Sequence, residues 1–260
     1  WSSDVCSSDL IFGTQECFIH QLKDMKEALP GYDYIGVGRD DGKEKGEHSA
    51  IFYRTDKFDV IEKGDFWLSE TPDVPSKGWD AVLPRICSWG HFKCKDTGFE
   101  FLFFNLHMDH IGKKARVESA FLVQDKMKEL GKGKELPAIL TGDFNVDQTH
   151  QSYDAFVSKG VLCDSYEKAG FRYAINGTFN DFDPNSFTES RIDHIFVSPS
   201  FQVKRYGVLT DTYRSIVGKG EKKQANDCPE EIDIKTYQAR TPSDHFPVKV
   251  ELEFDQRQQK

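Results

Sequence analysis

The chain has no hydrophobic run that could cross a membrane. Its longest purely apolar run, Phe101 to Phe104, is far shorter than the roughly 18 residues that a spanning helix needs. It also has no excess of basic residues, because 34 Lys and Arg stand against 43 Asp and Glu, for a formal net charge of −9. This balance argues against a protein that holds nucleic acid through a broad basic face. It does not exclude an enzyme that meets phosphate through a bound cation, since a metal can make an acidic site locally positive.

Cysteines at zinc-binding spacing are absent as well. None of the six cysteines forms a C-x-x-C pair, and the five beyond Cys6 are scattered along the chain. Cys87 and Cys94 lie on one expected strand and point to opposite faces, so they cannot pair with each other. We expect these cysteines to be small buried hydrophobic residues. Their pattern does not distinguish a reducing from an oxidising compartment.

Residues 1–10 have no periodic pattern and lack the basic and apolar regions of a signal peptide. Written back into codons, they match a common short-read sequencing adapter. We therefore interpret them as an adapter-derived scar, the alternative being a Ser-rich disordered leader. On this interpretation the domain covers residues 11–260, and localisation, cytoplasmic or exported, cannot be read from the chain.

Apolar residues make up 38% of the chain and include 21 Phe, which is enough for a packed core. Short apolar strands alternate with amphipathic helices, without internal repeats or a Pro-rich linker, and this pattern predicts one α/β domain with sheets between helices. The expected helices lie at 18–29, 113–130 and 152–159, and the expected strands at 50–54, 58–61, 85–94, 99–106, 138–141, 192–197 and 248–254. The helix at 113–130 should turn Val117, Ala120, Phe121, Met127 and Leu130 inward. The charged stretch 217–238 is typical of a solvated loop, or of a lid over a phosphate site.

Polar side chains cluster directly after or within the apolar strands, where a rigid scaffold holds them at the opening of a cleft. The clusters are Gln15-Glu16, Asn105 to His110, Gly142 to Asn145, Arg191 to His194, and Ser243 to His245. Each alone has an ordinary explanation, such as a turn, a helix start or a hydrogen-bonded core histidine. Together they suit magnesium or manganese, which take carboxylate and amide oxygens, with histidine beside them for proton transfer or phosphate contact. This is equipment for metal-assisted attack on a phosphorus ester.

The order of these motifs resembles the endonuclease/exonuclease/phosphatase superfamily. The segment 11–16 looks like the strand that ends in the family's Gln-Glu, and Asn105 to His110 is similar to its Asn-x-His-x-Asp-His strand end. Gly142 to Asn145 matches its Gly-Asp-Phe-Asn signature, and Ser243 to His245 matches its terminal Ser-Asp-His signature. The resemblance implies a four-layer α/β/β/α sandwich with two mostly antiparallel sheets. It also implies a phosphoester hydrolase of the phosphodiesterase or nuclease kind, which uses magnesium or manganese at a carboxylate site together with a His-Asp pair.

The resemblance also implies roles for individual residues. Glu16 would be the principal metal ligand and Asp244 a further acidic group at the metal. Asp143 and Asn145 would position or deprotonate the attacking water, and His107 would bind the scissile phosphate. His245, oriented by Asp193, would act as general acid or base, and which group is the base stays open. Family members normally begin with one more strand, which carries a metal-site Asn, so we expect residues 11–260 alone to be poorly stable and weakly active.

Three other readings compete with this one. Asn105 to His110 is one residue away from the His-x-His-x-Asp-His motif of binuclear zinc hydrolases of the metallo-β-lactamase type, but a ligand is then missing. A serine hydrolase based on Ser243 to His245 would lack the G-x-S-x-G elbow. A non-catalytic binding module of the same fold stays open.

The substrate class also stays open. The partner is expected to be a phosphoester substrate, as nucleic acid, nucleotide, or phosphorylated lipid or sugar head group, and the protein is expected to be a monomer. Trp67, Trp79, Trp89 and Phe179 could line a pocket that stacks on a base, although core packing is the commoner use of such residues. Asn176 begins a glycosylation sequon, yet Asn-Gly is first a turn former.

Overall fold

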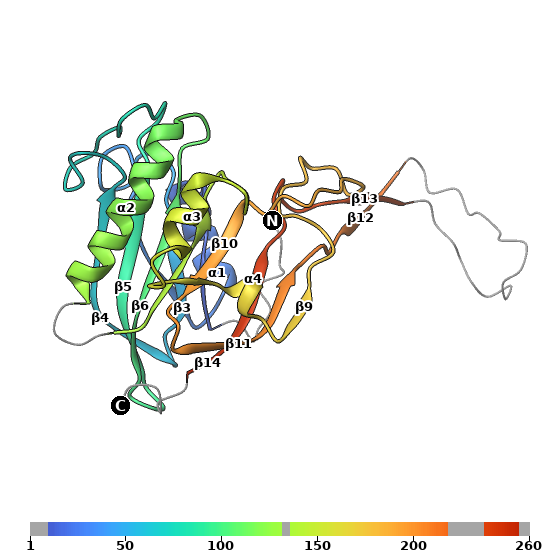
Figure 1. Ribbon diagram of the computed structural model, residues 1–260. Coiled ribbons are helices and arrows are strands. Elements are labelled where there is room, and N and C mark those ends of the chain that lie inside the picture. Colours follow the sequence, from blue (N-terminus) through green and yellow to red (C-terminus); the bar gives the residue numbers. More distant parts are fainter. Residues whose placement is uncertain (1–9, 132–135, 218–236, 255–260) are drawn as a thin grey trace, which may run out of the picture.

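The computed structural model describes residues 10–131, 136–217 and 237–254. In this part of the chain two layers of β-sheet pack face to face, and helices cover their outer faces (Figure 1). The α/β class and the α/β/β/α layering expected from the motifs are therefore confirmed. The expected loop at 217–238 lies mostly outside the described residues.

The first layer is a six-stranded mixed sheet. Its strands follow the order β4 (Phe58–Trp67), β5 (Ile86–Cys94), β6 (Glu100–His107), β7 (Ala138–Asp143), β10 (Asp193–Val197) and β8 (Cys163–Asp164). All neighbours are antiparallel except β6 and β7, which are parallel. The expected hairpin of β5 and β6 is present. Strand β4 is much longer than the expected 58–61, because it continues past a bulge at Val60/Glu62 to pair with the whole of β5.

The second layer consists of two three-stranded sheets. One has the order β1 (Ile11–Gly13), β3 (Ile51–Arg54), β2 (Tyr32–Ile35), and the other the order β14 (Val248–Phe254), β11 (Phe201–Val208), β9 (Phe171–Tyr173). Pairing is antiparallel apart from β9 with β11. A separate hairpin of β12 (Tyr213–Ile216) and β13 (Tyr237–Arg240) extends away from the body (Figure 1).

The side chains of each central strand divide between two hydrophobic cores. In β6, Phe101 and Phe103 face the core between the sheet layers, whereas Leu102 and Phe104 face the core beneath the outer helices. This two-residue alternation in an apolar run on a strand that is covered on both faces is what the sequence 101–104 predicts. Cys87 and Cys94 follow the same rule and lie in different cores. Cys17, Cys87, Cys94 and Cys163 are free thiols.

Within the described residues, four helices complete the layers. Helices α2 (Lys113–Leu130) and α3 (Gln151–Val157) cover the six-stranded sheet, while α1 (Ile19–Ala28) packs on β1, β3 and β2. The short α4 (Ser165–Lys168) contacts β10 and β11. The expectation that Phe121 turns inward is wrong: it is exposed beneath the ammonium group of Lys159, because Val123 and Gln124 occupy the buried face instead. In the described part of the chain, no helix is long and apolar enough to cross a bilayer.

The register of three central strands decides where the polar clusters meet. His107 at the end of β6 pairs with Asp143 at the end of β7, and Asp143 pairs in turn with Asp193 at the start of β10. These three side chains therefore form a row across one edge of the sheet. Gly142 makes this row possible, since its φ is +152° and a Cβ would lie 2.2 Å from the carbonyl oxygen of Leu106.

Candidate active site

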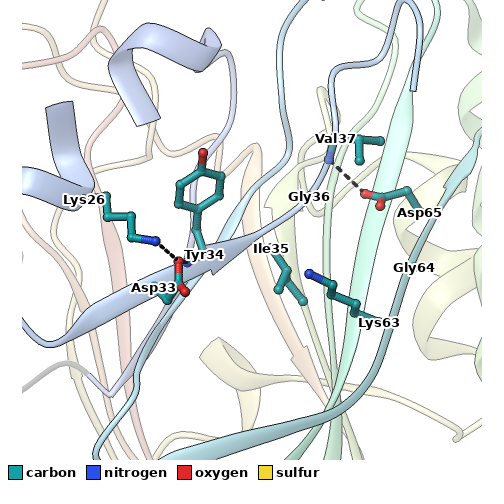
Figure 2. Close-up of a pocket in the computed structure, with 9 residues that line it drawn as sticks. All are labelled: Lys26, Asp33, Tyr34, Ile35, Gly36, Val37, Lys63, Gly64 and Asp65. Atoms are coloured by element: carbon teal, nitrogen blue, oxygen red, sulfur yellow. Dashed lines mark hydrogen bonds and ion pairs between the residues drawn. The ribbon is translucent and has the colours of Figure 1, made fainter. Parts of the chain in front are cut away.

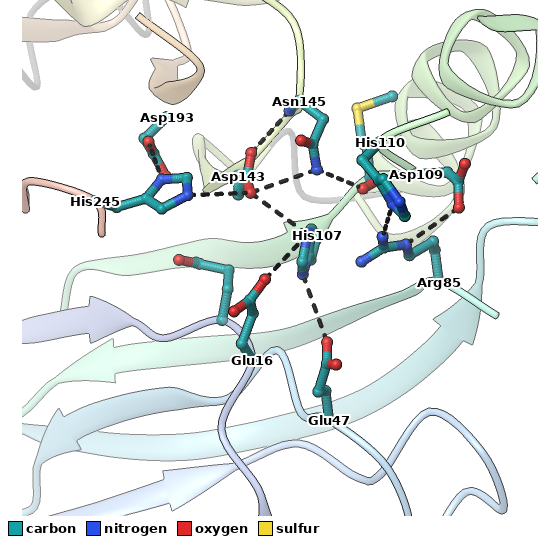
Figure 3. Close-up of polar contacts among 12 residues, drawn as sticks. Glu16, Glu47, Arg85, His107, Asp109, His110, Asp143, Asn145, Asp193 and His245 are labelled. Atoms are coloured by element: carbon teal, nitrogen blue, oxygen red, sulfur yellow. Dashed lines mark hydrogen bonds and ion pairs between the residues drawn. The ribbon is translucent and has the colours of Figure 1, made fainter. Parts of the chain in front are cut away.

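The row at the sheet edge brings histidines and carboxylates into direct contact (Figure 3). His107 Nε2 lies 3.4 Å from Asp143 Oδ2, and His245 Nε2 lies 4.0 Å from the same oxygen on the other side. His245 Nδ1 is 2.8 Å from Asp193 Oδ2. One carboxylate thus lies between two imidazoles, and a second carboxylate orients one of them.

A short segment around Thr178 holds the Asp193–His245 pair together. Thr178 Oγ1 accepts hydrogen bonds from the backbone N–H groups of Ile192 (2.9 Å) and Asp193 (3.1 Å). The carbonyl oxygen of Thr178 accepts from Phe246 N at 2.6 Å, so the segments before Asp193 and after His245 are joined to one buried residue. Sequence reasoning missed Thr178, which stood out only as the third residue of a sequon.

The environment drives the pKa values of the two central groups apart. Burial, and then the charge of Asp193, raises the pKa of Asp143 to about 7. Burial lowers the pKa of His245, but the hydrogen bond and charge of Asp193, together with Asp143 and Asp244, outweigh this and raise it to about 9. At neutral pH His245 is therefore cationic, while Asp143 titrates near neutrality.

The environment of His107 disfavours the charged form of its ring. It is only 6% exposed, and burial together with the nearby charges of Arg85 and Arg39 holds its pKa well below the usual range. Its Nδ1 atom lies 3.9 Å from Glu47 Oε2 and has no hydrogen-bond partner among the described residues. A neutral imidazole can donate one hydrogen bond to a phosphate oxygen without bringing charge.

Two glutamates form the acidic side of the site. The Glu16 carboxylate follows β1, is 61% exposed, and lies 4.0 Å from His107 Nε2. Partial burial, and then the charges of Glu47 and Asp244, raises the pKa of Glu16. Ligand atoms of Glu16, Glu47 and His107 all lie within 4.8 Å of one another, as do those of Asp143, Asp193 and His245. Neighbouring carboxylates repel one another, and a divalent cation that binds their oxygens would relieve this repulsion.

Glu47 was missed by the sequence reasoning, and Asp244 lies less centrally than expected. Glu47 stands in a charged loop without an apolar strand directly before it, so no sequence signal marks it. Asp244 belongs to neither group of ligand-distance atoms in the described part of the chain. It acts on Glu16 and His245 through its charge, while its backbone oxygen accepts from Asn180 N at 2.7 Å. Its role as a metal ligand stays a prediction.

Asn145 holds Asp143 in place. Its backbone N–H donates to Asp143 Oδ1 at 2.8 Å, and its amide donates to the Met108 carbonyl at 3.0 Å and lies 3.4 Å from Asp143 Oδ2. Asn145 has φ +51°, a strained value for a residue with a side chain, and such values concentrate at functional sites.

Asn105 serves the scaffold and is not a metal ligand. Its amide donates to the carbonyl oxygens of Thr14 and Ala50, and its Oδ1 accepts from Gln15 and Thr141. These bonds connect the two sheet layers and use the whole side chain. Asn105 therefore does not replace the histidine ligand that a binuclear zinc site would need here.

Other members of the polar clusters also have structural partners. The Arg191 guanidinium pairs with Asp164 at 2.9 Å, and His194 Nε2 lies 2.9 Å from the Val146 carbonyl. Ser243 Oγ accepts from the backbone of His245 instead of facing its ring, because the ring turns to Asp193. This geometry agrees with the rejection of a serine hydrolase on sequence grounds.

The expected aromatic pocket is not assembled as a unit. Trp67 and Trp89 are buried, and the Trp67 indole N–H donates to the Arg39 carbonyl. Phe179 does reach the site: it is 40% exposed, and its ring centroid lies 5.2 Å from that of His245. The side chain of Asn176 bonds Ser186 and Thr188 and so braces its own loop.

A pocket outside the candidate site lies between β2 and β4 (Figure 2). It encloses about 440 Å³ and is lined by Lys26, Lys63, Asp33 and Asp65 among others. Lys26 and Asp33 form an ion pair at 2.7 Å, and Asp65 accepts from Ser88 and Val37. Lys26, Asp33 and Asp65 are thus paired with one another or with the scaffold, and among the described residues no histidine lines this pocket.

Comparison with known proteins agrees with the fold and with the motifs. The chain matches the Endonuclease/Exonuclease/phosphatase family over residues 4–245. It is similar to the solved structure of mannosyl-6-phosphatase Bt3783 from Bacteroides thetaiotaomicron VPI-5482, with 85% identity, 94% of this chain and 85% of that chain covered, and a TM-score of 0.86. A family protein from Bacteroides vulgatus is 38% identical, with the same coverages and a TM-score of 0.78. Among curated proteins, uncharacterized protein L388 of Acanthamoeba polyphaga mimivirus is 31% identical over 92% of this chain and 84% of its own length. The chain belongs to the endonuclease/exonuclease/phosphatase family.

Proposed function

We propose that this chain is a divalent-metal-dependent phosphoester hydrolase whose substrate is the phosphate monoester of a sugar. The observation that carries the hydrolase part is the row His107, Asp143 and Asp193 with His245 at one sheet edge. It places a carboxylate with a near-neutral pKa beside a cationic imidazole, which is the pairing that acid–base chemistry requires. A binding module without turnover would not need this separation of pKa values.

The acidic residues fit magnesium or manganese. Glu16 would be the main ligand, as the motif implies, with Glu47 and Asp244 adding negative charge around it. When bound, the cation neutralises phosphate charge and lowers the pKa of water. It would also offset the burial and the repulsion from Glu47 and Asp244, which together raise the pKa of Glu16.

The protein's own residues divide the remaining work. Asp143 accepts the proton of the attacking water, since it is the group that ionises near pH 7. His245, protonated and oriented by Asp193, stabilises the charge that develops on the phosphate oxygens and protonates the departing alkoxide. His107 donates a hydrogen bond to the phosphate, and Asn145 keeps Asp143 in position. This assigns the base to Asp143 and the acid to His245.

The sugar monoester is supported by the 85% identity with a protein that is named a mannosyl-6-phosphatase. Nucleic acid, a nucleotide and a phosphorylated lipid head group are the competing substrates, and the net charge of −9 weighs against the first of these.

A substrate panel tests the proposal. Mannose 6-phosphate, glucose 6-phosphate, bis(p-nitrophenyl) phosphate, a short RNA and a short single-stranded DNA are incubated with the protein in magnesium, in manganese, and in excess EDTA. We expect phosphate release from the hexose phosphates in either metal and none in EDTA. Turnover of the oligonucleotides in preference would replace the sugar monoester by a nuclease substrate. Absence of metal-dependent turnover on the whole panel would favour the non-catalytic module.

A further inference from the structure

A buried arginine stands next to the proposed phosphate site with part of its guanidinium unused (Figure 3). Arg85 is 4% exposed and lines a narrow cleft together with Glu16, Glu47 and His107. Its Nη2 donates to His110 Nδ1 at 2.9 Å, and its Nε lies 3.5 Å from Asp109 Oδ2. Its Nη1 has no hydrogen-bond partner among the described residues. Burial of a guanidinium is unfavourable unless its N–H groups are paired, so an acceptor that reached Nη1 would relieve this cost.

Asp109 does not explain why Arg85 is there. The Asp109 carboxylate already accepts from the backbone N–H groups of Ile111 (3.0 Å) and Gly112 (2.7 Å). Its Oδ2 also accepts from Val82 and Leu83. Four backbone donors satisfy this carboxylate without Arg85, and the contact to Arg85 is the longest of its bonds. Asp109 and His110 therefore position Arg85 and leave Nη1 free for another acceptor.

A second buried arginine lines the same cleft. Arg39 is 8% exposed and forms a two-bond pair with Glu47, at 2.5 and 2.9 Å, while its Nε has no partner among the described residues. The cleft is narrow: its open space, about 160 Å³ with the adjoining solvent included, leaves no room to enclose a small molecule. Arg85 and Arg39 can therefore meet only the near edge of a group that lies beside the cleft, and a second ester substituent on that edge would not fit. A monoester carries close to two negative charges at neutral pH, whereas a diester carries one.

We propose that Arg85, supported by Arg39, binds a terminal oxygen of a phosphate dianion and makes the site selective for phosphate monoesters over diesters. This rests on the proposed function, because the selected group is the one that the site would hydrolyse. Arg85 supplies positive charge on the side of the cleft that it shares with His107. Lysine at this position would keep the charge but lose the planar fork that reaches His110 and the phosphate together.

The test compares Arg85→Gln and Arg85→Lys with wild type and with Arg116→Gln. Arg116 is a matched control, since it is buried to a similar degree and donates to the Asp109 carbonyl, but it lies on α2 outside the cleft. Three quantities are measured on the full chain: kcat/KM for mannose 6-phosphate and for bis(p-nitrophenyl) phosphate in magnesium, the affinity for inorganic phosphate by calorimetry in magnesium and in EDTA, and Tm.

We expect Arg85→Gln to lower kcat/KM for the monoester, and phosphate affinity, on the order of 10- to 100-fold, which is the range for a hydrogen bond to a charged group. The diester should change by much less, Arg85→Lys should lie between, and Arg116→Gln should leave the monoester-to-diester ratio as it is. Unchanged phosphate affinity in a folded Arg85→Gln variant overturns the inference, as does equal loss of both substrates. If wild type hydrolyses neither ester, the proposed function fails, and the phosphate affinities of wild type and Arg85→Gln still decide whether Arg85 binds phosphate.

Discussion

Replacing Asp193 by Asn tests the acid–base assignment most directly. The substitution keeps the shape of the side chain but removes the charge that lies 2.8 Å from His245 Nδ1. A rise in the pKa of His245 from 6.5 to about 9 corresponds to about 3 kcal/mol of preferential stabilisation of the protonated ring. A neighbouring opposite charge accounts for about 1–3 pKa units in such pairs.

We expect the alkaline limb of the pH profile to move in this variant. In wild type, kcat/KM should rise as Asp143 ionises near pH 7 and fall as His245 loses its proton near pH 9. In Asp193→Asn the upper limb should move down by about 1–3 pH units, with activity at pH 8 reduced about 10-fold for a shift of two units. The assay is kcat/KM for mannose 6-phosphate in magnesium between about pH 5 and 10, with the His245 ring titrated in parallel by NMR.

The same variant has a defined signature in stability. Folding raises the pKa of His245 above its unfolded value, so the contribution of the pair is fully present below about pH 6.5 and is lost as pH rises through about 9. The difference in unfolding free energy between wild type and Asp193→Asn should shrink over that window. Asp59→Asn, which removes an exposed charge on β4, is the control and should move neither curve. An alkaline limb that stays at its wild-type position in Asp193→Asn would refute the assignment of His245 as the acid.

Three further predictions concern the metal, the strained turn and the core. Glu16→Gln should raise the magnesium concentration for half-maximal activity about tenfold or more, since it removes the charge of the expected ligand; an unchanged magnesium titration would count against that role. Gly142→Ala should lower the free energy of unfolding by about 2–4 kcal/mol, because its Cβ would lie 2.2 Å from a backbone oxygen at φ +152°, and a thermal melt equal to that of wild type would contradict this. Phe156→Ala should cost about 3–5 kcal/mol in denaturant unfolding, against about 0.5 kcal/mol or less for the exposed Phe121→Ala, and equal losses would show that the burial is misassigned.

Much of the fold follows from local pattern. The apolar run at 101–104 predicted a strand covered on both sides, and the spacing of apolar residues predicted α2 with its bounds at 113 and 130. The direction of Phe121 was wrong because helical periodicity alone did not show that small and polar residues, among them Ser119 and Gln124, occupy the buried face. The full length of β4 was missed since its central residues 61–63 are exposed, which interrupts the strand pattern before the buried end at Phe66 and Trp67.

The candidate site also consists of residues that local sequence predicted and residues that it did not. Short polar motifs next to apolar strands contained Glu16, His107, Asp143, Asn145, Asp193 and His245, so the residue types and their order were readable. Glu47, Thr178 and Arg85 were not, because nothing in their local sequence marks them. Their importance arises from contacts between segments far apart in the chain.

The sequence by itself determined the alternation of strands and helices, the family, and the residue types that can bind metal and move protons. Those properties depend on local periodicity and side-chain chemistry, which need no distant partner. Only the tertiary structure decided that His107, Asp143 and Asp193 form one row, that the pKa values of Asp143 and His245 are driven apart, and that Arg85 keeps a donor free. Strand register, burial and charge at close range cause these effects, and all three arise only when the chain has folded.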